Sequence, residues 1–274
     1  MPRALLAATY FLATALALAF LVLPVAAIFL HVPPGRLFDQ LSNPVVSDAL
    51  LVTLKTSLAA QALILLFGTP LAYLLATRRF PGRTVLVTLV ELPIVLPPAV
   101  AGIGLLVAFG RTGLLGKHFG LWEHVAFNWL AVTFAVMLVA GPFYVRSAIA
   151  AFEAVDQNLV AASRTLGAGP ARTFFRVALP LAGGGLAAGE AISLARGIGE
   201  FGATIMFAGS LRGHTQTLSL AGYQEFDSNF DTALAISALL VVVSLAILLT
   251  LKLSVLWQPS RSISTFRFVR SSSS

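Results

Sequence analysis

The segment Ala161-Ala162-Ser163-Arg164-Thr165-Leu166-Gly167, followed after nine residues by Val177-Ala178-Leu179-Pro180, decides the fold of this chain. It is a basic loop between two apolar stretches, 129–150 and 177–208. A helix needs about 20 mostly apolar residues to cross the hydrocarbon core of a bilayer, and each stretch is long enough. A basic loop between two such stretches is typical of a protein that crosses the membrane several times.

The composition agrees with a membrane protein. Of the 274 residues, 58% are hydrophobic and only 11% are charged, which leaves too little polar cover for a soluble domain. The absence of cysteine excludes a disulfide framework and a thiolate metal site. The net charge of +7 does not indicate nucleic-acid binding, because the cations lie in loops between apolar runs and are not interleaved with aromatic residues.

Six stretches are long and apolar enough to span a bilayer: 4–30, 49–76, 85–109, 129–150, 177–208 and 233–256. Because backbone amides in lipid must be satisfied internally and the stretches lack strand alternation, we expect six helices. The first run is too long for a secretion signal and is expected to stay as a span. The sequence predicts an all-α membrane protein with one transmembrane domain, 1–258, and a basic, disordered tail, 259–274.

The distribution of basic residues predicts the orientation. Six crossings place both termini on one side, and if that side is the cytoplasm it holds twelve of the 18 Lys and Arg residues, against four on the other side. The twelve are Arg3, Arg78, Arg79, Arg83, Arg146, Arg164, Arg172, Arg176, Lys252, Arg261, Arg267 and Arg270, and the four are Arg36, Arg111, Lys117 and Arg212. We therefore expect a multi-pass protein with cytoplasmic termini.

The longest predicted cytoplasmic loop, 151–176, has the residues of two short helices with a bend between them. Asp156 or Asn158 can cap the first helix. Gly167 can adopt the left-handed conformation that ends it, and Pro170 suits the first turn of the next helix.

The fifth stretch contains charges that lipid would penalise. Arg196 and Glu200 are four residues apart, so on one helix they can pair, and Gly197, Gly199 and Gly202 would permit close packing or local unwinding. The pair either fixes helix packing or belongs to a pathway or gate, and the sequence leaves both open. Glu190 has no basic residue at helical spacing and needs a partner on another span, water or a proton.

The third stretch contains Pro93, Pro97 and Pro98, each of which removes an amide donor, so this span must bend. A bent helix is a candidate gate wall. Glu91 lies just before the prolines, and we expect it to reach Arg83 or Arg79, as an anchor or as part of a pathway.

The segment quoted first resembles the signature of ABC-importer permeases, which is Glu-Ala-Ala, three residues, Gly, nine residues, and Ile-x-Leu-Pro. The spacing from Gly167 to Pro180 is complete, whereas Ala161, Ser163 and Val177 replace the family's Glu, second Ala and Ile. In that family a short helix in this loop seats in a groove of the ATPase subunit. The resemblance implies docking by Ala161, Ala162, Ser163, Arg164, Thr165, Leu166, Gly167, Ala168, Pro170 and Thr173.

Two further stretches resemble the molybdate-type permeases, which belong to the binding-protein-dependent transport inner-membrane components. They are residues 199–209 with Thr215-Gln216-Thr217-Leu218, and Leu92-Pro93-Ile94-Val95-Leu96-Pro97-Pro98-Ala99-Val100. The resemblance implies a type I importer fold in the cytoplasmic membrane of a bacterium or archaeon. It also implies a homodimer with two ATPase subunits and an external oxyanion-binding protein that docks on the outer loops 111–122 and 209–230. Molybdate is the first expectation, with tungstate, sulfate or thiosulfate as alternatives. The pathway or gate candidates are Glu91, Pro97, Pro98, Arg196, Gly199, Glu200, Gly202 and Thr204.

The chain has no Gly-x4-Gly-Lys-Ser/Thr phosphate loop, so we expect a partner subunit to use ATP and Mg²⁺ while this chain binds no cofactor. We expect no catalytic residues and no metal site, since the four histidines are scattered without ligand spacing. An intramembrane enzyme is a weak rival, because no predicted span contains Asp or His. A passive channel or scaffold is the other rival, and it would not need to grip an ATPase.

Overall fold

The long apolar runs form helices in the computed structural model, which describes residues 3–31, 34–119, 125 and 127–256. The described part is all-helical and has no strand, as predicted. Its helices are α1 (Arg3–His31), α2 (Pro34–Leu41), α3 (Pro44–Leu63), η1 (Ile64–Gly68), α4 (Thr69–Thr77), α5 (Arg83–Val95), α6 (Pro98–Phe109), α7 (Leu114–Phe119), α9 (Trp129–Glu153), α10 (Gln157–Thr165), α11 (Pro170–Thr173), η2 (Phe174–Ala178), α12 (Leu179–Ile198), α13 (Gly202–Phe207), α14 (Leu218–Ser228) and α15 (Phe230–Leu256). The predicted tail, 259–274, lies outside the described residues.

Six helical segments of the described chain are long and apolar enough to span a membrane, which agrees with the predicted number. They are Leu6–His31, Pro44–Thr77, Pro98–His118, Trp129–Glu153, Pro170–Ile198 and Phe230–Thr250. The second and fifth contain a π-helical turn, η1 and η2, just before Pro70 and Pro180. A proline lacks the N–H and crowds the carbonyl of the preceding turn, and the wider turn lets the helix continue past it.

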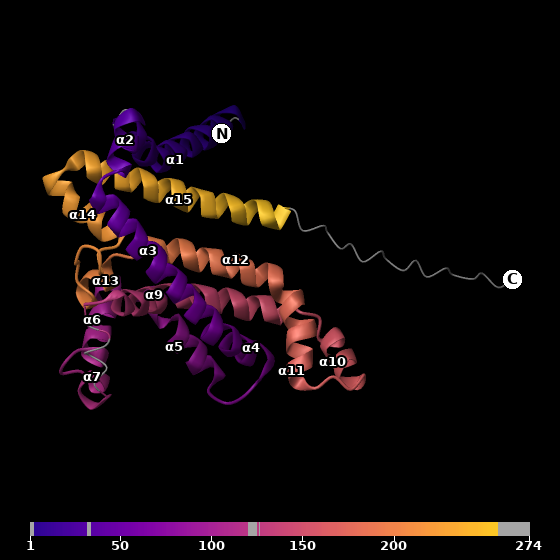
Figure 1. Ribbon diagram of the computed structural model, residues 1–274. Helices are drawn as coiled ribbons and strands as arrows, with labels where there is room; N and C mark the ends of the chain where they lie inside the picture. The colour runs from indigo at the N-terminus through magenta and orange to yellow at the C-terminus, as the bar shows by residue number, and fades with distance from the viewer. Residues whose placement is uncertain (1–2, 32–33, 120–124, 126, 257–274) are drawn as a thin grey trace.

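The core is built around α9. Figure 1 shows α9, α12 and α15 running roughly along one direction, with α3 crossing them obliquely. Small residues of α9, among them Ala131, Ala135, Ala140 and Ala148, are fully buried. Small side chains let neighbouring helices approach closely where no water is available to drive association. The fourth span is accordingly the most buried of the six, since 56% of its 18-residue apolar stretch is buried inside the structure.

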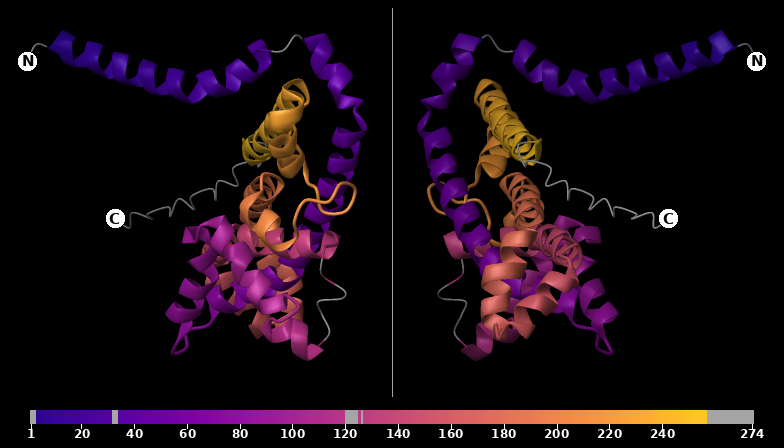
Figure 2. Two further views of the ribbon diagram at one scale, coloured as in Figure 1. Left: turned by 90° about the vertical axis from the view of Figure 1, so that its left-hand side faces the viewer. Right: turned by 90° about the vertical axis from the view of Figure 1, so that its right-hand side faces the viewer.

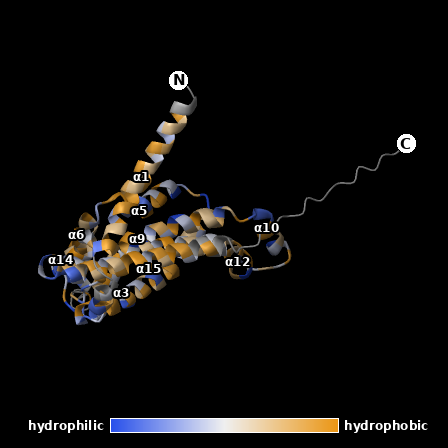
Figure 3. Cartoon of the chain, turned by 90° about the horizontal axis from the view of Figure 1, so that it is seen from above, coloured by the Kyte–Doolittle hydropathy of each residue, from blue (hydrophilic) through white to orange (hydrophobic). Residues whose placement is uncertain are grey.

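The two ends of the bundle differ in sequence and in polarity. α2, α13, α14 and the start of α9 gather at one end, whereas α10, α11 and the connection from α4 to α5 gather at the other (Figure 1). Figure 3 shows hydrophilic residues on α14 and α10 at the two ends, and predominantly hydrophobic helices between them. The end that carries α10 is called the α10 end below.

α1 stands apart from the bundle. Figures 2 and 3 show that it projects away from the other helices, and none of its span is buried by the rest of the chain. Large side chains such as Phe11 and Phe20 are more than three-quarters exposed. An apolar helix without cover from its own chain must be covered by lipid or by another protein.

Two predicted spans are broken helices. The stretch 85–109 forms α5 and α6, separated at Leu96 and Pro97, so the third candidate span begins at Pro98. The stretch 177–208 ends its long helix at Ile198 and resumes in α13 at Gly202. The prolines and glycines named from the sequence account for both breaks. The sequence predicted a bend in the first stretch and left unwinding of the second open, and the helix is interrupted completely in both.

Candidate functional site: the α10 elbow and the breaks in spans 3 and 5

The segment from α10 to α11 forms a sharp elbow, whose local chemistry matches the sequence. Asp156 caps α10 by accepting a hydrogen bond from the backbone N–H of Asn158, 2.9 Å away. Gly167 has a φ of +81°, and the N–H of Ala168 donates to the carbonyl of Ser163 at 3.0 Å. This left-handed glycine ends the helix, and Pro170 opens α11.

The elbow presents an exposed face. Leu166 is 88% exposed, whereas Val160 on the same helix is buried. Of the ten residues predicted to dock an ATPase, seven are exposed in this chain: Ala161, Ala162, Arg164, Thr165, Leu166, Gly167 and Pro170. Ser163 and Ala168 are half-buried, and Thr173 is fully buried. Thr173 therefore supports the elbow from inside and does not belong to its exposed face.

The elbow is fixed to the foot of the fifth span. The hydroxyls of Ser163 and Thr173 lie 3.1 Å apart and join α10 to α11. Beneath them, the ring of Phe174 lies 4.7 Å from that of Tyr73, which in turn lies 5.2 Å from that of Phe152. These edge-to-face contacts tie the start of span 5 to α4 and α9. A displacement of α10 would therefore be passed to three spans.

The break in span 5 is held by Glu200. This side chain is 2% exposed, and its Oε1 accepts a hydrogen bond from the N–H of Ala203 at 2.8 Å. Its Oε2 lies 3.0 Å from Nη1 of Arg196. The predicted ion pair is thus confirmed, although Glu200 lies beyond the end of α12, so the two residues do not share one helix. The carboxylate joins the end of α12 to the first turn of α13.

The two helix breaks pack against each other. A Cβ on Gly202 would come within 2.9 Å of Cβ of Pro98, and a Cβ on Gly102 within 2.6 Å of the carbonyl oxygen of Ala203. α6 and α13 therefore touch through backbone. The structure brings together the predicted gate residues Pro98 and Gly202, and Pro97 stands at the N-cap position of α6.

Two other gate candidates, Gly199 and Thr204, have different surroundings from Pro98 and Gly202. Gly199 faces open space, since a Cβ there would meet nothing within 4 Å. Thr204 is fully buried in α13, and its hydroxyl has no hydrogen-bond partner among the described residues. The close approach predicted for the glycines accordingly applies to Gly197 and Gly202, and Gly199 serves the turn.

The partner expected for Glu91 was wrong. Its carboxylate lies 3.6 Å from Nε of Arg146 on α9, and Arg83 instead pairs with Glu153 at 2.6 Å. Both pairs join α5 to α9, so the third span is held to the fourth near the α10 end. Glu91 is not part of the contact between the two breaks.

A polar junction within the core was missed from the sequence. Ser193 on α12 donates to the carbonyl of Ala140 on α9 at 3.0 Å. Gln61 on α3, with its amide nitrogen turned towards the acceptors, donates to Glu190 and to Ser193, each at 3.2 Å. Glu190 thus has the partner on another span that its position requires. A lone Gln in the apolar stretch 49–76 was the available signal.

Residues 68–257 match the family of binding-protein-dependent transport system inner membrane components. The chain belongs to this family. The matched part contains the α10 elbow and both helix breaks.

Two individual relatives are also transport system permease proteins. This chain is 40% identical over 233 residues to the molybdenum transport system permease protein ModB of Mycobacterium tuberculosis, covering 84% of this chain and 88% of that one. It is 34% identical over 238 residues to the sulfate transport system permease protein CysT of Salmonella typhimurium, covering 84% and 85%. The crystal structure of a bacterial ABC transporter that imports alginate has a TM-score of 0.66 at 18% identity, covering 91% of this chain and 94% of that one. The permease fold predicted from the sequence is confirmed.

Proposed function

We propose that this permease is the membrane subunit of an ATP-driven, binding-protein-dependent importer of a tetrahedral oxyanion, with molybdate as the first candidate. The identity of 40% over most of both chains to a molybdenum permease carries this proposal. Tungstate has the same shape and charge and is the second candidate. Sulfate or thiosulfate is the third, supported by the lower identity to a sulfate permease.

The substrate is tested by transport. The permease is reconstituted in liposomes with its ATPase and binding protein, and uptake of molybdate, tungstate and sulfate is measured with ATP inside. Molybdate uptake that exceeds sulfate uptake supports the proposal, and preferred sulfate uptake overturns the substrate assignment. Flux of any of these anions at the same rate without ATP would instead favour the passive channel.

We place the ATPase on the α10 elbow, one ATPase subunit for each of two copies of this chain. Leu166 supports this, because an apolar side chain that is 88% exposed beside a basic helix end is a natural anchor for a partner's groove. ATP and Mg²⁺ are then used by the ATPase. Closure of two ATPase subunits moves both elbows, and the spans re-pack between inward-open and outward-open states.

The docking experiment is a pull-down of the ATPase with the permease. Leu166→Glu is expected to lose the ATPase, since it puts a charge at the proposed apolar contact. Leu211→Glu is the matched control, because Leu211 is an exposed leucine, at 47%, at the opposite end of the bundle. Equal recovery of the ATPase by both variants would remove the elbow from the interface.

We propose that the α10 end faces the cytoplasm, with both termini, in a bacterial or archaeal inner membrane. The excess of basic residues supports this orientation. The binding protein would then dock at the other end, on loops 111–122 and 209–230, of which 120–122 lie outside the described residues. The uncovered α1 supports a second copy as a neighbour.

Orientation can be tested cleanly because the chain has no cysteine. Single cysteines at Gly169 and at Arg111 are labelled in spheroplasts with a maleimide that cannot cross the membrane. Labelling of Arg111→Cys alone supports the proposed orientation, and labelling of Gly169→Cys alone reverses it.

A further inference from the structure

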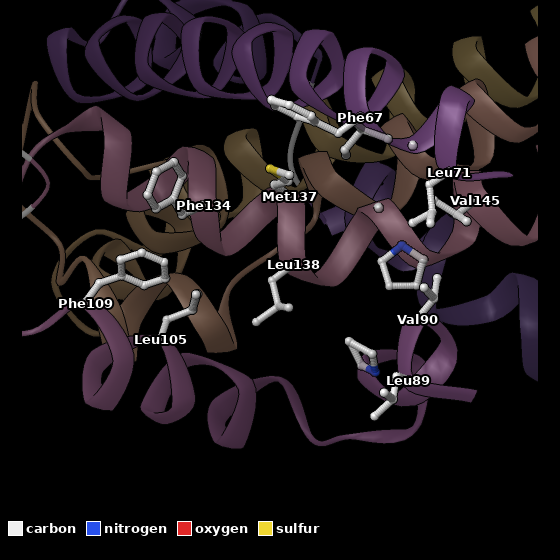
Figure 4. A pocket seen from close by; sticks show the side chains of 15 residues that line it. Phe67, Leu71, Leu89, Val90, Leu105, Phe109, Phe134, Met137, Leu138 and Val145 are labelled. Carbon is white, nitrogen blue, oxygen red and sulfur yellow. The ribbon is translucent and has the colours of Figure 1, made fainter. Parts of the chain in front are cut away.

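An apolar hollow of about 450 Å³ lies between the second, third and fourth spans (Figure 4). Phe67 and Leu71, Leu89 and Pro93, and Leu138 and Val145 are among the side chains that line it from the three sides. Its volume is within the ~300–1,000 Å³ typical of ligand sites. An occupant must be apolar, because the lining offers almost no polar atom.

The hollow has a structural origin. The second span contributes a π-helical turn that ends at Gly68, α9 contributes Gly141 and Pro142, and the third span is broken just beyond α5. The break moves α6 away from the line of α5. Because protein interiors are otherwise closely packed, a gap of this size leaves room for a ligand.

A second hollow, which is polar, follows towards the α10 end. It has about 480 Å³ and is lined by Ala76, Thr77, Arg79, Arg83, Glu153 and Gln157. Its residues lie on or next to the same helices, α4, α5 and α9, that line the apolar hollow. At 1.5 Å per residue, the steps from Leu71 to Ala76 and from Leu89 to Arg83 are roughly 8–9 Å along the helices. The polar hollow therefore lies nearer to the α10 end along these helices.

The charges at the polar hollow favour an anion. Arg83 is used within the chain, because it donates to the carbonyl of Leu75 and pairs with Glu153, both at 2.6 Å. Arg79 is exposed and has no ion pair with any of the described residues, and the same holds for its neighbour Arg78. One free guanidinium therefore lines the hollow, with a second beside it.

We propose that an anionic phospholipid binds here, with one acyl chain in the apolar hollow and its phosphate at Arg79. An apolar slot for a chain and a basic mouth at the polar end of the spans are the two parts that such a lipid requires. Basic residues at the membrane surface attract anionic headgroups. The bound chain fills the gap between spans 2, 3 and 4 and supports the break in span 3.

Native mass spectrometry of the permease with its ATPase subunits tests this site. The delipidated complex is titrated with dioleoyl phosphatidylglycerol and, separately, with dioleoyl phosphatidylcholine. We expect a saturable phosphatidylglycerol site for each permease chain that phosphatidylcholine fills more weakly. Arg79→Gln is expected to weaken phosphatidylglycerol binding about fivefold, the typical effect of one basic residue, and Arg111→Gln at the opposite end to leave it unchanged.

A second pair of variants tests the apolar hollow. Leu138→Trp fills the space and is expected to remove the site, whereas Leu245→Trp, on an exposed position of α15, is not. Glycerol 1-phosphate should not bind to the wild-type complex; if it binds as tightly as the lipid, the site takes a small anion and the proposal is wrong. Equal binding of both phospholipids, unaltered by Arg79→Gln, also overturns it.

One other occupant gives a different result. If α1 of a second copy fills the hollow, Leu138→Cys and Leu16→Cys on two copies should form an intermolecular cross-link, and this would contradict the lipid proposal. Absence of that cross-link together with lipid binding lost in Leu138→Trp supports it. Neither result depends on which anion is transported.

Discussion

The hydroxyl of Ser163, near the end of the exposed helix α10, lies 3.1 Å from the hydroxyl of Thr173, which is fully buried at the foot of the fifth span. Ser163 also donates to the carbonyl of Val160 at 2.8 Å. While the Ser163 hydroxyl donates to Val160, its oxygen accepts a hydrogen bond from the hydroxyl of Thr173. This bond joins α10 to α11, so it holds α10 to the start of span 5.

Removing the bond should loosen the elbow without unfolding it. Thr173→Val keeps the shape of the side chain and leaves Ser163 its bond to Val160, so we expect a loss of about 1 kcal/mol of stability. Ser163→Ala should cost a similar amount. The double variant should cost less than the sum, because both changes break the same bond. Thermal unfolding of the purified complex measures this, and strictly additive losses would mean that the two hydroxyls do not interact.

Gly167 offers a sharper test of the elbow because Gly169 is its matched control. Gly167 has a φ of +81°, whereas Gly169 has a φ of −66°, and a Cβ at either position would meet nothing within 4 Å. Gly167→Ala should therefore cost about 1–2 kcal/mol through backbone strain alone, and Gly169→Ala close to nothing. Thermal unfolding and ATPase pull-down are measured on both. Equal behaviour of the two variants would show that the left-handed turn is not required.

Local chemistry made the elbow predictable from the sequence. A capping aspartate, a glycine that can take a positive φ and a proline in a first helical turn each act within a few residues, and Asp156, Gly167 and Pro170 took those positions. The six spans were predictable for a similar reason, since hydrophobic length is a property of one segment.

Contacts between spans were less predictable. Glu91 was assigned to Arg83 or Arg79 because these lie near it in the sequence, but packing of α5 on α9 brings Arg146 closer. The contact of Pro98 with Gly202 joins residues from separate spans, and the sequence supplied both residues without their pairing. Whether 177–208 unwinds at its glycines was left open, because apolar composition does not distinguish a continuous helix from a helix break held by Glu200.

The hydrogen bond between Gln61 and Glu190 predicts that removing one partner costs more stability than removing both. Gln61→Leu leaves the carboxyl of Glu190 without its partner from α3, so we expect a loss of about 0.6–1.7 kcal/mol, the range of hydrogen bonds between membrane helices. Replacing both residues by Leu removes the unpaired group and should recover part of that loss. Thermal unfolding of the complex in detergent measures both variants.

The recovery is the decisive part of that experiment. If Gln61→Leu, Glu190→Leu and the double variant lose stability additively, the two side chains do not depend on each other. A double variant that is stable but transports no anion would show that the Gln61–Glu190 pair has a role in transport beyond packing.

The contact between the two helix breaks can be tested within one helix. Gly102 and Gly104 both lie in α6, but a Cβ on Gly102 would fall 2.6 Å from the carbonyl oxygen of Ala203, whereas one on Gly104 would meet nothing within 4 Å. Gly102→Ala should push α13 away and cost about 1–3 kcal/mol, because backbone cannot yield as a flexible side chain can. Gly104→Ala should stabilise by about 0.5–1 kcal/mol, as alanine does in a helix interior. If the breaks move against each other during transport, Gly102→Ala should also lower anion uptake at unchanged ATPase binding. Uptake that equals that of Gly104→Ala would leave this contact with a purely structural role.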